Sequence, residues 1–138
     1  MVAVMAGCGG DDESSSLSKA EFTKEADAIC ARQEEKKNKD LIAAYKKYGE
    51  EGRKGKKAQA DFILEAALPP IAQMTEELAD LGAPSGEEDK VEAMVQALEE
   101  EIQNIEDDPI GTATGKVGDF DKANKLAKEL NLKACSQI

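Results

Sequence analysis

Residues 85–109 read SGEEDKVEAMVQALEEEIQNIEDDP and show the clearest helical pattern in the chain. Their apolar side chains recur every three or four residues, as on one face of an α-helix: Val91, Met94, Val95, Leu98, Ile102 and Ile105. Residues 85–88 have the Ser-x-x-Glu form of a capping box, and Asp107-Asp108-Pro109 ends the pattern. We therefore predict a helix that begins at this box, packs its apolar stripe on a core and turns its glutamates to solvent.

A long helix is predicted earlier in the chain, over about residues 18–48. It begins at a second Ser-x-x-Glu box, at Ser18 and Glu21. Its apolar spacing stays in phase only if Gln33 and Lys37 lie on the core-facing side of the helix, a position that we call the seam. We therefore expect the middle of this helix to be exposed or lightly packed. The apolar spacing resumes in the last turns, where we expect Tyr45 and Tyr48 to pack in the core. Glycines at residues 49–55 then mark a turn.

A second helix starts near Lys56 and meets two prolines, Pro69 and Pro70. Proline lacks a backbone N–H and clashes with the preceding turn, so we predict a kink or a break at this point. We expect the prolines to bend the helix around the core. The alternative is that the helices part here and leave a pocket. The apolar spacing continues to Leu81, and Gly82 ends the helix.

Residues 107–118 are rich in glycine and poor in apolar side chains, so we predict a flexible loop there. A short final helix follows, with Asp119 as its cap, Asn131 in the left-handed position after it and Leu132 folding back on its last turn. No stretch alternates apolar and polar residues as a strand would. We therefore predict an all-α fold, a four-helix bundle-like domain with a long first helix, a Pro-kinked second helix and a short C-terminal helix.

The composition predicts a thin core. Of the 138 residues, 41% are apolar, but 21 of these are Ala and only 26 are Leu, Ile, Val or Phe. With a net charge of −11, the composition lies close to that of disordered proteins. Because the larger apolar residues are concentrated in helical stripes, we nevertheless predict a single folded domain over residues 18–138.

Charge is distributed unevenly along the chain: residues 31–57 carry a net charge of +5 and residues 58–112 a net charge of −14. We expect the basic segment to pack beside the acidic one and to reduce its self-repulsion. The alternative is a basic patch for an anionic surface. The overall charge of −11 argues against a nucleic-acid partner, because contacts to phosphates dominate that affinity.

The chain contains no His, which excludes Ser–His and Cys–His nucleophiles and His-ligated metal sites. Acid–base chemistry would depend on carboxylates alone, and consecutive carboxylates on a helix point in different directions. We therefore predict no enzymatic activity, no cofactor and no metal site.

The N-terminus, MVAVMAGCGGDDESSS, places small residues and a short apolar stretch before Cys8. This order resembles the lipobox of bacterial lipoproteins, in which cleavage occurs before the Cys and its thiol receives a diacylglycerol. A signal peptide also has a basic first region, and no Lys or Arg precedes Cys8. We interpret residues 1–7 as the remnant of a signal peptide and residues 8–17 as a lipidation site with a flexible polar tether.

If Cys8 is lipidated, Cys30 and Cys135 are left as an even pair. They could form a bridge that ties the end of the chain to the first helix, or they could be two buried free thiols.

The lipobox-like start, the Cys30 helix and the Cys135 ending together resemble small uncharacterised helical lipoproteins of high-GC Gram-positive bacteria. The resemblance implies a Cys30–Cys135 disulfide and an envelope location, and it carries no activity.

The function we expect is an extracytoplasmic, lipid-anchored helical binding or structural module on the outer face of the cell membrane. Its partners would be the membrane, through the anchor on Cys8, and a cell-envelope protein or a small apolar ligand. The alternative is a cytosolic acidic helical domain for protein–protein interaction, in which Cys8 is a chance residue.

Overall fold

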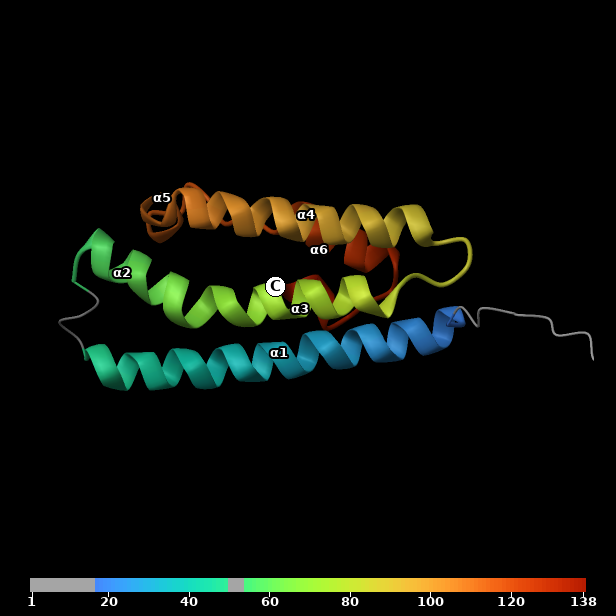
Figure 1. Ribbon diagram of the computed structural model, residues 1–138, viewed down its shortest axis with the longest axis horizontal. Helices are drawn as coiled ribbons and strands as arrows, with labels where there is room; N and C mark the ends of the chain where they lie inside the picture. The colour runs from blue at the N-terminus through green and yellow to red at the C-terminus, as the bar shows by residue number, and fades with distance from the viewer. Residues whose placement is uncertain (1–16, 50–53) are drawn as a thin grey trace, which may run out of the picture.

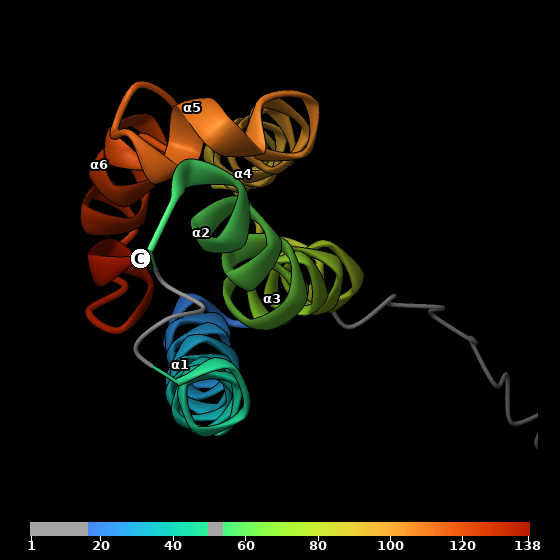
Figure 2. The same cartoon turned by 90° about the vertical axis from the view of Figure 1, so that its left-hand side faces the viewer.

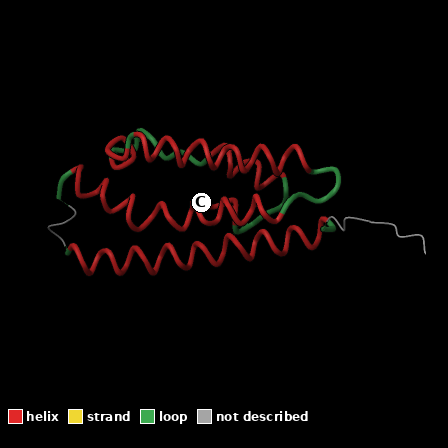
Figure 3. The backbone as a smooth tube through the Cα atoms, viewed as in Figure 1, coloured by secondary structure: helices red, strands yellow, loops and turns green. Residues whose placement is uncertain are grey.

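The computed structural model describes residues 17–49 and 54–138, and within these ranges every regular element is helical (Figures 1 and 3). The all-α prediction is confirmed. The elements are α1 (Lys19–Tyr48), α2 (Lys56–Phe62), a π-helical segment (Ile63–Ala67), α3 (Leu68–Leu81), α4 (Glu88–Asp107), α5 (Pro109–Ala113), α6 (Asp121–Glu129) and a 3-10 turn (Cys135–Gln137).

Helix α1 begins as predicted, at a complete capping box. The Ser18 hydroxyl accepts from the Glu21 backbone N–H at 3.2 Å, and the Glu21 carboxylate accepts from the Ser18 N–H at 3.0 Å. In the middle of α1, Gln33 is buried and Lys37 is partly buried, which confirms the predicted seam.

The predicted core position of Tyr45 is wrong, because this side chain is 41% exposed and Ile42, one turn earlier, is 57% exposed. The side chain of Tyr48 lies outside the part of the chain that the structure describes.

The two prolines do not break the second helix. Helix α2, the π-helical segment and α3 follow one another directly, and Pro69 and Pro70 occupy the first turn of α3. In the wider π turn before them, the N–H of Leu68 donates to the carbonyl of Ile63, five residues back. The π segment thus lets the helix continue although two donors are missing.

Helix α4 covers the predicted stretch, but its predicted capping box is wrong. The N-cap residue is Glu87, and the structure gives it no capping hydrogen bond. The Glu88 carboxylate instead accepts from the Gly86 N–H at 2.7 Å, and Glu87 is paired with Lys19 and Lys90. The turn through Gly86, which has a positive φ of 87°, moves Ser85 out of the capping position.

The flexible loop predicted at residues 107–118 is also wrong in part, because it contains the short helix α5. The Asp108 carboxylate caps α5 by accepting from the Gly111 N–H at 2.7 Å. Farther along, the Glu101 carboxylate accepts from the N–H groups of Gly118 and Asp119 at 2.7 and 2.8 Å. These carboxylates bond the segment's backbone to its own start and to α4.

The end of α6 follows the prediction closely. Asn131 has a φ of 60°, and the N–H of Leu132 donates to the carbonyl of Ala127 at 2.9 Å. The N–H of Asn131 donates to the carbonyl of Lys128 at 3.0 Å, which completes a Schellman motif. Leu132 is 1% exposed and so directs the chain back into the core.

The core lies between α1, α3, α4 and α6, which gives the predicted bundle-like arrangement (Figure 2). Its fully buried larger side chains include Phe22, Leu78, Met94, Leu98, Leu130 and Leu132. Helix α6 packs mainly on α4 and on the C-terminal turn, whereas α2 packs on α5. Figure 1 shows that α2, α5 and the last turns of α1 lie at one end of the bundle, and that α1 starts at the opposite end. We call the former the distal end.

Candidate functional site

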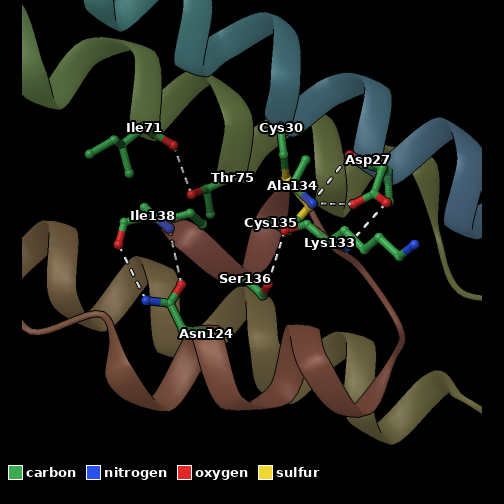
Figure 4. The surroundings of a disulfide bond; sticks show 11 residues. Asp27, Cys30, Ile71, Thr75, Asn124, Lys133, Ala134, Cys135, Ser136 and Ile138 are labelled. Carbon is green, nitrogen blue, oxygen red and sulfur yellow. Dashed lines mark hydrogen bonds between the residues drawn. A yellow bond between two sulfur atoms is a disulfide. The ribbon is translucent and has the colours of Figure 1, made fainter.

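Two of the three cysteines predicted as site residues are described, and they are joined. Cys30 of α1 and Cys135 of the C-terminal turn form a disulfide across 105 residues of sequence, with their Cα atoms 5.2 Å apart (Figure 4). Both residues are buried, at 3% and 1% exposure. The bridge is therefore present in preference to two free thiols. Cys8, the predicted signal-peptide remnant of residues 1–7 and the tether up to residue 16 lie outside the described residues.

Polar contacts hold the C-terminal tail on both sides of this bond. Asp27 lies one turn before Cys30, and its carboxylate accepts from the N–H groups of Lys133 and Ala134 at 3.1 and 2.9 Å. On α6, the Asn124 amide donates to the main-chain oxygen of Ile138 and accepts from its N–H, both at 3.2 Å. Figure 4 shows both contacts beside the disulfide.

Sequence reasoning did not find Asp27 or Asn124. Their partners are backbone groups, which have no signature in the sequence, and Asp27 bonds residues 106 and 107 positions away. The only sequence signal for this contact is the position of Asp27, one helical turn before Cys30, and that signal alone is weak.

The expected packing of the basic segment beside the acidic one is only sparsely present among the described residues. Arg32 pairs with Glu77 of α3, and Lys47 pairs with Glu65 of the π-helical segment at 3.7 Å. The other ion pairs of this segment join neighbours on the same helix, as in Lys36 with Asp40 at 3.1 Å. The lysines in the distal half of α1 therefore pair mainly with carboxylates of their own helix and only sparsely with the acidic segment.

An apolar hollow of about 450 Å³ lies at the distal end, between α1 and α2. We call it the distal groove and define it by its lining residues, Leu41, Ile42, Tyr45, Lys46 and Phe62. Its lining surface is almost entirely apolar, so Lys46 contributes its alkyl stem to the wall. A separate hollow of about 380 Å³ lies beside Pro69, where the sequence left a pocket as an alternative, and Glu106 forms part of its wall.

In the described residues, the clear pKa shifts occur at carboxylates that form a helix cap or ion pairs. Hydrogen bonds from Lys19 and then Lys90 lower the pKa of Glu87, and those from Ser18 lower the pKa of Glu21. Residues 17–49 and 54–138 contain no cluster of three His, Cys, Asp or Glu side chains suited to a metal ion. None of the helices in these ranges has the length and apolarity needed to cross a bilayer.

Comparison with protein-family models, curated proteins and solved structures finds no match to this chain.

Proposed function

We propose that this protein is a helical binding module anchored by a lipid to the outer face of the cell membrane, without catalytic activity. The disulfide between Cys30 and Cys135 carries the proposal. Structural disulfides form and persist in oxidising compartments outside the cytoplasm and are rare inside it. This one is buried and joins the C-terminal turn to the first helix, as a structural cross-link does.

The proposed anchor is a diacylglycerol on Cys8. This is the third cysteine, and it follows an Ala-Gly pair in the lipobox-like order. Residues 9–16 are glycines, acids and serines, a composition suited to a flexible spacer. The folded part starts at the Ser18 cap, so the spacer would separate the bundle from the membrane surface.

Of the two kinds of partner considered, the distal groove favours a small apolar ligand over a cell-envelope protein. Ligand sites in proteins are hollows of about 300–1,000 Å³ with mostly apolar walls and a few polar groups. The distal groove has a volume of about 450 Å³ and an almost entirely apolar wall, as such sites do.

The anchor is tested on protein isolated from its native host by detergent phase separation. We expect the wild-type protein in the detergent phase and a Cys8→Ser variant in the aqueous phase. The matched control is the Cys30→Ala/Cys135→Ala double variant, which keeps Cys8 and is expected in the detergent phase. Wild-type protein that stays in the aqueous phase with a Cys8 thiol open to alkylation would contradict the anchor and favour the cytosolic interaction domain.

A further inference from the structure

Large apolar side chains that are exposed concentrate at the distal end. In the described residues they are Ile42, Tyr45 and Ile110, with exposures of 57%, 41% and 48%. Ile42 and Tyr45 lie together on α1 and line the distal groove with Phe62 of α2. Solvent-facing apolar side chains that share a hollow are typical of binding sites, whereas isolated ones are not informative.

The alkyl stem of Lys46 forms part of the groove wall, which places its ammonium group next to the apolar surface. Lys46 lines the groove, and the described residues place no carboxylate within ion-pair distance of it. Lys36 and Lys39, by contrast, pair with carboxylates on their own helix. An ammonium without a carboxylate beside an apolar wall can attract an anionic group that is attached to an apolar chain.

The charge of the surrounding sequence favours the same ligand. Residues 36–57 contain nine basic and three acidic side chains, a net charge of +6, so the rest of the chain carries −17 to reach the total of −11. A small anion is therefore attracted to this segment and repelled from the remainder of the protein.

We propose that the distal groove binds a single-chain anionic amphiphile, with its alkyl chain on Leu41, Ile42 and Phe62 and its head group beside Lys46. The shared chemistry is a long alkyl chain with a carboxylate or phosphate head, as in a fatty acid or a lysophospholipid. A partner protein would typically need about 800 Å² of contact surface, more than five lining residues offer. The proposal names the ligand class of the proposed binding module and rests on it for its setting, but binding does not require the lipid anchor.

The test uses the full chain with Cys8→Ser, in its oxidised form, so that failure of ligand binding leaves the proposed anchor untouched. Dodecanoate, dodecyl phosphate and dodecan-1-ol share one alkyl chain and differ in the head group. The two anions are titrated by calorimetry below their micelle-forming concentrations and the alcohol below its solubility limit, and native mass spectrometry gives the stoichiometry. We expect saturable binding of one molecule of each anion and about tenfold weaker binding of the alcohol. Tighter binding of dodecanoate would identify a fatty acid, and tighter binding of dodecyl phosphate would identify a lysophospholipid.

Two exposed substitutions, Ile42→Ser and Lys46→Glu, test the site, and circular dichroism checks that each variant folds. We expect each to weaken binding of both anions about tenfold. The matched controls are Ile110→Ser on α5 and Lys125→Glu on α6, which change an equally exposed apolar side chain and an exposed lysine outside the groove. We expect these controls to bind as the parent chain does.

The proposal is overturned if the parent chain binds neither anion saturably. It is equally overturned if Ile42→Ser and Lys46→Glu bind as their controls do, because binding then occurs elsewhere. Binding of dodecan-1-ol as tight as that of the anions would refute the role of Lys46.

Discussion

Replacing Cys30 and Cys135 together by alanine should remove a large fraction of the net stability of the fold. The disulfide closes a loop of 105 residues, and the chain-entropy relation gives about 4.7 kcal/mol for a loop of this length. Because domains of this size are stable by only about 5–15 kcal/mol and this core is thin, the loss is a large fraction of the total. Alanine is the appropriate replacement, since both positions are buried and serine would place a hydroxyl there.

The assay is equilibrium unfolding in urea, followed by circular dichroism at the helical band. With an m-value of about 2 kcal/mol/M, the predicted loss lowers the urea midpoint by about 2–3 M. The reduced wild-type protein is the control, and it should unfold near the midpoint of the double variant. A loss below about 1 kcal/mol would refute the reasoning, because the contacts of Asp27 and Asn124 would then hold the tail without the bond.

Three further predictions concern single side chains. Hydrogen bonds from Lys19 and Lys90 lower the pKa of Glu87 below 4.5, so its ionised form stabilises the fold above that pH, and the contribution is lost as the pH falls through the lowered pKa. Glu87→Gln should therefore lower the melting temperature at pH 7 but not near pH 2, and an equal decrease at both values would count against this pairing. Gln33 is buried with its Oε1 unpartnered, so Gln33→Met should raise the free energy of unfolding by about 1 kcal/mol in urea, and a marked decrease would show that its bond to Glu77 matters more. Leu132→Ala should cost about 2–4 kcal/mol, whereas Asn131→Gly, which keeps the positive φ, should be near neutral; equal effects would contradict the Schellman geometry.

The features that the sequence predicted correctly depend on local spacing. The Ser18 and Glu21 box, the stripe of α4 and the left-handed Asn131 each involve residues within a few positions of one another. Local chemistry nearly determines the backbone at such places. The two wrong predictions also concern local structure. At Ser85, Gly86 allows a different turn from the one that a capping box needs. In residues 107–118, the five-residue helix α5 is too short to show a helical period.

The distal groove and the disulfide depend on packing between residues far apart in the sequence, which residue spacing does not predict. The exposure of Ile42 and Tyr45 follows from where other elements lie, since α6 packs on α4, whereas α1 packs on α3 and on the π-helical segment. Residue spacing alone left Cys30 and Cys135 as a disulfide or as two free thiols, and the structure joins them where Asp27 holds the tail. The proposed lipidation of Cys8 was predicted from the sequence alone and awaits its own test.

Peptide mapping of protein taken from its native cells, digested without reduction after free thiols are blocked, tests the central claim most directly. We predict one cross-linked peptide pair that contains Cys30 and Cys135, which separates into two peptides on reduction. Alkylated Cys30 and alkylated Cys135 in the unreduced digest would show that the protein carries free thiols in the cell. That result would contradict both the covalent attachment of the tail and the proposed extracytoplasmic location.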